Sequence, residues 1–156
     1  MKTSSISDIQ KELKTLDKQQ TIELCMRLAK YKKENKELLT YLLFDSVDEN
    51  RFIANIKVEI DDLFNKMNTS NMYFTRKSVR KVIRFTNKFI NYSGLEQTEI
   101  ELRIYFCLRF KSSGIPIHKS ETLINLYNNQ VEKIKKTLSK LHEDLQYDYL
   151  KEIEQL

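Results

Sequence analysis

Residues that break helices are almost absent from this 156-residue chain, which contains two glycines and one proline. In a helix interior glycine costs about 1 kcal/mol and proline about 3 kcal/mol relative to alanine, so their scarcity favours long helices joined by short turns. No segment shows the alternation of apolar and polar residues that is typical of strands. We therefore predict an all-α fold, a single compact domain of about seven helices over residues 1–156, arranged as a helical bundle or a short α-solenoid-like array.

Apolar residues recur at helical spacing in successive segments, and capping residues separate these segments. The first helix is short, and residues 1–16 are expected to pack loosely as an N-terminal helix. A later segment, residues 100–110, is apolar on nearly all sides, which predicts a central helix covered by its neighbours. The expected helices cover residues 6–16, 17–33, 38–44, 49–67, 73–92 and 96–110, and a last helical region follows Ser120.

The last helical region carries an apolar seam with alternating spacings of four and three residues, which is typical of a coiled coil. Its members are Tyr127, Val131, Ile134, Leu138, Leu141 and Leu145. Asp148 stands at the next expected seam position, and this interruption predicts a local break in the helix there. We expect the seam to pack inside its own bundle. The alternative is a homodimer through the Tyr127 to Leu145 seam.

The two cysteines, Cys25 and Cys107, are far apart in sequence, and each stands among apolar residues. This is the usual pattern of buried free thiols, and it indicates a reducing compartment. Residues 1–8 contain no secretory signal, and no window approaches the roughly 18 apolar residues of a membrane span. We therefore expect a cytoplasmic location.

Positive charge is concentrated in residues 65–95, which hold seven Lys or Arg and no Asp or Glu. Residues 1–64 hold 11 basic and 12 acidic side chains, and residues 96–156 hold 9 and 10, so the pI of about 9.1 reflects one segment. At about 100° per residue, six of the seven cations share one arc of the helix over residues 73–92. These six are the predicted partner-binding or phosphate-binding residues: Arg76, Lys77, Arg80, Lys81, Arg84 and Lys88.

The partners that suit this arc are an acidic protein surface or a nucleic acid. A membrane is not expected, because the apolar half of the helix is needed for the core. Phe85, Phe89 and Tyr92 fall on that apolar half, which argues against base stacking and leaves point charges suited to phosphates. An ordinary surface helix also shows a charged outer face, and acidic neighbours would neutralise it if they packed against it. Those neighbours are Glu59, Asp61, Asp62, Glu96, Glu99 and Glu101.

Catalytic motifs are absent from the sequence. It has no glycine-rich phosphate loop, no Cys-x-x-Cys, no His-Glu-x-x-His and no Gly-x-Ser-x-Gly. Ile115 and Ser139 stand three residues before the two histidines, where a bundle di-iron site needs Glu. We therefore expect no enzyme activity, no cofactor and no metal site, and an enzyme with an unfamiliar site is kept only as a third class.

The leading functional hypothesis is a non-catalytic helical interaction module that binds a macromolecular partner through the basic helix face. The alternative is a protein that binds the phosphate backbone of nucleic acid directly. A helix-turn-helix made of residues 121–127 and 130–141 is a minor alternative, because Asn128-Asn129 leaves less chain than the usual three- to four-residue turn.

Overall fold

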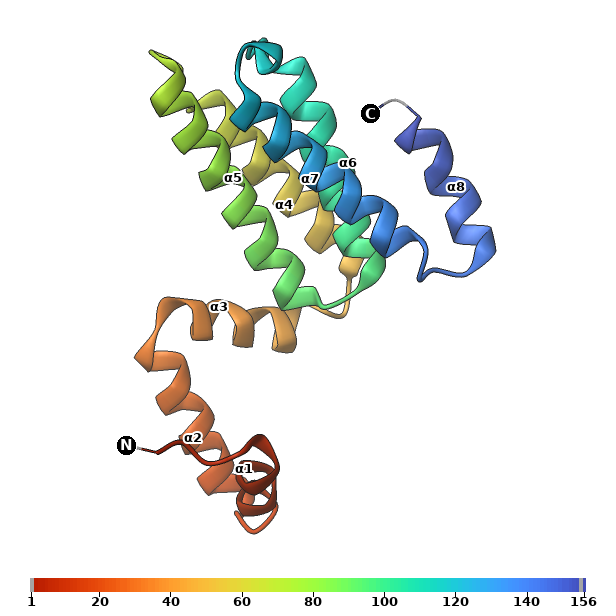
Figure 1. Ribbon diagram of the computed structural model, residues 1–156. Helices are drawn as coiled ribbons and strands as arrows, with labels where there is room; N and C mark the ends of the chain where they lie inside the picture. The colour runs from red at the N-terminus through yellow and green to blue at the C-terminus, as the bar shows by residue number, and fades with distance from the viewer. Residues whose placement is uncertain (1, 155) are drawn as a thin grey trace. The chain divides into compact units, whose positions relative to one another are not determined.

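The computed structural model describes residues 2–154 and 156, and all of their regular structure is helical (Figure 1). These residues form eight α-helices, one π-helical turn and one 3-10 turn. The predicted all-α fold class is thereby confirmed, with one helix more than the expected seven. Contacts divide the chain into an N-terminal unit, Met1–Phe44, and a C-terminal unit, Asp45–Leu156. The grouping of the whole chain into one domain stays a prediction.

The N-terminal unit consists of α1 (Ile6–Leu13), α2 (Lys18–Tyr31) and α3 (Lys33–Thr40), and the π-helical turn η1 (Tyr41–Asp45) continues from α3. A capping box opens α2, because the Gln20 N–H donates to the Asp17 carboxylate at 2.8 Å and the Asp17 N–H donates to the Gln20 amide oxygen at 3.0 Å. Among residues 2–44 only Tyr41 is buried. This unit therefore has helices but almost no core.

The two cysteines differ in their surroundings. Cys107 on α6 (Glu96–Ser112) is fully buried, and burial raises the pKa of its thiol to about 12. Cys25 on α2 is exposed. The prediction that both thiols are buried was therefore wrong for Cys25. The reason is that the few helices of the N-terminal unit do not cover the apolar residues around it.

The C-terminal unit packs α4 (Glu49–Asn65), α5 (Met72–Ser93) and α7 (Glu121–Leu138) around α6, as Figure 1 shows. The 3-10 turn η2 (Ile117–Lys119) joins α6 to α7. Several α6 side chains on different sides of the helix are at most 1% exposed: Ile100, Leu102, Phe106, Cys107 and Phe110. The prediction that this helix is central is confirmed, because neighbours cover it on several sides.

One charged side chain, Arg103, is buried in this centre and is 5% exposed. Its Nε donates to the Glu99 carboxylate one turn earlier at 2.8 Å. Its Nη1 donates to the Asn87 amide oxygen of α5 at 3.0 Å and to the Gln130 amide oxygen of α7 at 2.6 Å. The guanidinium therefore ties three helices together with its hydrogen bonds satisfied, which a buried cation requires.

The ends of α5 follow local signals. The Asn71 side chain accepts from the Phe74 N–H at 3.0 Å and caps the first turn. Gly94 closes the helix in the left-handed conformation, with φ of 70°, and its N–H donates to the Ile90 carbonyl at 2.8 Å. Both features agree with the predicted helix over residues 73–92 and with Gly94 as its closing residue.

The last helical region differs from its prediction. α7 ends at Leu138, and α8 (Glu143–Ile153) begins after a short turn, so the break lies ahead of Asp148. The His142 ring nitrogen accepts from the Asp144 N–H at 3.4 Å, and acidic residues in the first turn of α8 suit the positive end of its dipole, which favours a new helix start here. The helix-turn-helix alternative for residues 121–141 is wrong as well, because α7 is continuous through Asn128-Asn129.

The middle of the seam is buried inside the C-terminal unit, since Ile134 is 0% exposed and Leu138 is 7% exposed, whereas Tyr127 and Val131 are half-buried. The homodimer through Tyr127 to Leu145 stays a prediction. α8 contacts α6 through Tyr149, whose hydroxyl donates to the Glu101 carboxylate at 3.4 Å. It carries four acidic side chains against one lysine, and in Figure 1 it lies on the side of this unit opposite α5.

We expect Arg103→Ala to lower the free energy of unfolding by about 3 kcal/mol, because it removes a buried cation and leaves the partly buried Glu99 carboxylate unpaired. Urea denaturation followed by circular dichroism measures this change. Arg84→Ala is the matched control, because Arg84 is exposed and forms no ion pair among the described residues, and its change should stay within about 0.5 kcal/mol. Equal effects of the two substitutions would contradict a structural role for the Arg103 network.

We also expect the two thiols to react in separate steps with a disulfide reagent. Cys25 is exposed and should react at once in the folded protein. Cys107 should react only as the C-terminal unit unfolds, because it is buried and its pKa is raised to about 12, which leaves little thiolate. Absorbance titration in buffer and in denaturant, repeated with Cys25→Ser, distinguishes the two steps.

Candidate functional site

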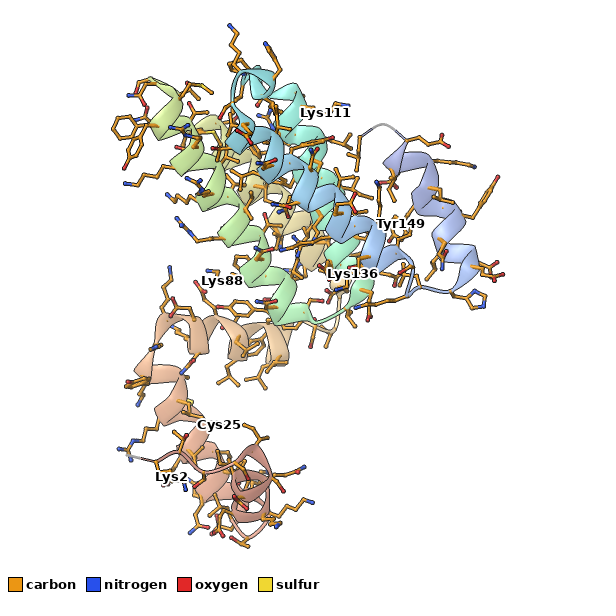
Figure 2. All side chains as sticks on the ribbon, viewed as in Figure 1. Lys2, Cys25, Lys88, Lys111, Lys136 and Tyr149 are labelled. Carbon is orange, nitrogen blue, oxygen red and sulfur yellow. The ribbon has the colours of Figure 1, made fainter. Side chains whose placement is uncertain are left out.

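The side of α5 that faces the core fixes which side faces water. Its buried residues form one stripe along the helix: Thr75, Val79, Val82, Ile83, Thr86 and Ile90. Packing this stripe on α4 and α6 turns the opposite arc outward. Figure 2 shows nitrogen-tipped side chains projecting from α5 away from the neighbouring helices.

The six predicted residues lie on this outward arc, which we call the basic face of α5 (Arg76, Lys77, Arg80, Lys81, Arg84 and Lys88). Four of them are exposed, and Arg76 and Lys88 are half-buried. From the first to the last the face rises about 18 Å along the helix axis. The cations therefore form a row on a rigid element.

Asp61 of α4 and Glu101 of α6 bind side chains outside the basic face of α5. The Asp61 carboxylate accepts from Arg109 Nε at 2.9 Å and from the Tyr105 hydroxyl at 2.5 Å. Glu101 accepts from Lys57 Nζ at 2.9 Å. These contacts join α4 to α6, so the carboxylates serve the interface between those two helices. Burial, together with the neighbouring Asp61, raises the pKa of Tyr105 to about 12, so its hydroxyl keeps its proton and remains a donor at neutral pH.

Two further acidic neighbours, Glu99 and Asp62, also pair with side chains outside the basic face. Glu99 pairs with Arg103, and Asp62 pairs with Lys66 at 3.5 Å. Within residues 2–154 and 156, no carboxylate forms an ion pair with five of the six cations, namely Arg76, Lys77, Arg80, Lys81 and Arg84. Among the described residues, acidic neighbours therefore do not neutralise the charge of these five side chains.

Lys88 has a different environment from the other five cations. Its Nζ lies 4.6 Å from the centre of the Phe89 ring and 5.8 Å from that of Phe85, within the range of cation–π attraction. Phe85, Phe89 and Tyr92 lie on the apolar half of α5, as expected, but they are half-buried and not part of the fully buried stripe. The Phe89 ring contacts the buried Phe52 ring of α4, with 6.1 Å between the ring centres.

Two aromatic residues beside the basic face were not among the residues predicted from the sequence. Tyr73 and Phe74, in the first turn of α5, are 62% and 39% exposed, and their rings meet edge to face at 5.3 Å. By its position on the helix Tyr73 falls within the cationic arc, one turn before Arg76 and Lys77. The same 100° construction applied to Tyr73 predicts this placement from sequence.

Lysines of α7 also approach α5. A hollow of about 420 Å³ between the two helices is lined by Ile83 of α5 and by α7 side chains that include Lys133 and Lys136. Figure 2 labels Lys136 on α7 and Lys88 on α5. These lysines belong to residues 130–141, which the sequence analysis gave as the second helix of the helix-turn-helix alternative. Their place beside α5 depends on how α7 packs, which no local pattern encodes.

Two other kinds of feature are absent from the part of the chain that the structure describes. No group of three or more His, Cys, Asp or Glu side chains there is arranged to hold a metal ion. None of the helices there is both long enough and apolar enough to cross a membrane. Comparison with protein-family models, with curated proteins and with solved structures finds no match to the chain.

We expect the double substitution Arg80→Glu and Arg84→Glu to leave the free energy of unfolding within about 0.5 kcal/mol of the original, because both side chains are exposed and neither has an acidic partner in the part of the chain that the structure describes. Lys57→Glu is the comparison, because it places a carboxylate against Glu101 at a half-buried ion pair, and it should cost about 1 kcal/mol or more. Denaturation midpoints by circular dichroism measure both. A large loss for the double variant would mean that the basic face is structural.

Proposed function

We propose that this protein is a non-catalytic helical interaction module whose basic face of α5 binds an acidic macromolecular partner. The observation that carries the proposal is the set of five cations on one rigid helix face with no acidic partner among residues 2–154 and 156. In a folded protein whose other charges are closely balanced, such a row concentrates positive potential along one line. An extended anionic surface matches it best.

The chemistry of the face suits oxygen anions. Arg76, Arg80 and Arg84 recur every four residues, so each guanidinium stands about 6 Å along the axis from the next. Guanidinium groups bind carboxylates and phosphates through two parallel hydrogen bonds, whereas the lysines act as point charges. A partner with carboxylates or phosphates in a row would therefore engage several of these side chains at once.

Direct binding of nucleic acid is the second candidate, and one specific observation favours it. Tyr73 offers an exposed ring at the end of the basic face, and single-stranded nucleic acid is bound by a cationic track combined with aromatic rings on which bases stack. Lys133 and Lys136 of α7 add positive charge beside α5. A polynucleotide lying along this part of the C-terminal unit would meet both features.

One titration tests the proposal. Fluorescence anisotropy is recorded with labelled poly-L-glutamate, mixed-sequence single-stranded RNA and duplex DNA at several salt concentrations. For a duplex that contacts five phosphates, the logarithm of the binding constant should fall against the logarithm of the salt concentration with a slope of roughly −4 to −5. Arg80→Glu with Arg84→Glu should abolish binding to any probe that uses the face.

The control is Lys14→Glu with Lys18→Glu, which changes the net charge equally at exposed residues of the N-terminal unit. It should retain binding. Tighter binding of RNA than of the other probes, together with an affinity for RNA about tenfold weaker in Tyr73→Ala, would favour the nucleic-acid candidate. Preference for poly-L-glutamate would favour an acidic protein. Flat titrations with all three probes at low salt would refute the proposed function.

A further inference from the structure

The N-terminal unit contains an open groove between α2 and α3, with a volume of about 680 Å³. It lies wholly within residues 26–44 and shares no residue with the basic face of α5. Apart from Thr40, its lining residues are of two kinds. We call the five apolar ones its floor and the four lysines its rim: Met26, Ala29, Leu39, Leu43 and Phe44, and Lys30, Lys32, Lys33 and Lys36. We propose that this groove binds an amphipathic helix of a partner protein, with apolar residues on one side and Asp or Glu on its flanks.

The apolar floor is unusually accessible for a folded protein. Met26 is 47% exposed, Leu43 is 60% exposed and Phe44 is 67% exposed. Scattered single apolar residues are normal on a surface, but a contiguous apolar groove with a polar rim marks a binding site. Because only Tyr41 is buried among residues 2–44, the unit gains its missing core from whatever fills the groove.

The length of the groove suits a helix. Lys36 and Phe44 lie eight positions apart along α3 and η1, which is about two helical turns. A bound helix of that length presents apolar residues at positions i, i+4 and i+7, the usual anchors of a helix in a groove. Leu39 and Leu43, one turn apart, provide matching contacts on the wall.

The positive charge of the rim favours an acidic ligand. Lys30 and Lys36 are exposed and form no ion pair in the described residues, and Lys33 shares only a 3.6 Å pair with Glu37. Acidic flanks on the bound helix would pair with these lysines and fix its direction. A second copy of the same groove would bring like charges together, since residues 1–44 hold nine basic and six acidic side chains. An acidic partner helix therefore fits better than self-association.

The test uses the full-length protein and three labelled peptides of roughly four helical turns. The first has leucines on one side and glutamates on its flanks, the second has lysines in place of the glutamates, and the third keeps the glutamates but has glutamine in place of leucine. Anisotropy should show the first peptide binding at least about tenfold more tightly than the other two. Amide shift changes in NMR spectra should fall in residues 26–44.

Variants make the assignment specific. Leu43→Asp with Phe44→Asp should weaken binding of the first peptide at least about tenfold, and Lys30→Glu with Lys36→Glu should reverse the preference toward the lysine-flanked peptide. Ile6→Asp is the control, because Ile6 is 82% exposed and lies outside the groove, and it should bind like the original protein.

Failure of this proposal is distinguishable from failure of the function proposed for α5. Equal binding of the first and third peptides, or shift changes in residues 76–88, would assign the binding to the basic face and overturn the groove proposal. Absence of binding of the first peptide at about 1 mM would overturn it as well. Concentration-dependent self-association lost in Leu43→Asp with Phe44→Asp would assign the groove to a second copy, and binding to anionic lipid vesicles in place of the peptides would assign it to a membrane.

Discussion

The buried guanidinium of Arg103 is the contact on which the rest of the C-terminal unit depends. A cation inside an apolar helix is tolerated only when its donors are satisfied, and here the acceptors come from the same helix, from α5 and from α7. The hydrogen bond to Asn87 holds one edge of α5 against α6. Together with the buried stripe of α5, this contact sets the rotation of the helix about its own axis and leaves most of the cationic arc exposed to solvent.

Most of the local structure could be predicted from the sequence because local signals determine it. Periodicity, the cap at Asn71 and the left-handed Gly94 placed α5 within one residue of its observed ends, and the all-round apolar pattern identified the central helix. The partners of the acidic residues were not predictable, because an ion pair such as Asp61 with Arg109 depends on the relative rotation of two helices. Exposure of Cys25 likewise depends on what covers α2, and the break after Leu138 depends on a cap formed by a histidine.

Part of the candidate site could likewise be predicted from the sequence, and part could not. The six cations of the basic face were identified by counting and by a helical projection, and whether acids cover them required the packing of α4 on α6.

The two units also differ in how binding affects them. The C-terminal unit has its own core and should hold its shape with or without a ligand. The N-terminal unit buries only Tyr41 among its described residues, so a ligand that binds its folded form stabilises it by mass action.

The acidic α8 lies on the opposite side of the C-terminal unit from the cationic arc of α5. This separation of sign contributes an electric dipole along the line from α8 to α5. If the proposed binding to a polyanion holds, that dipole exerts an orienting torque before contact, with α5 leading and α8 trailing. The association rate would then depend on salt more steeply than the dissociation rate.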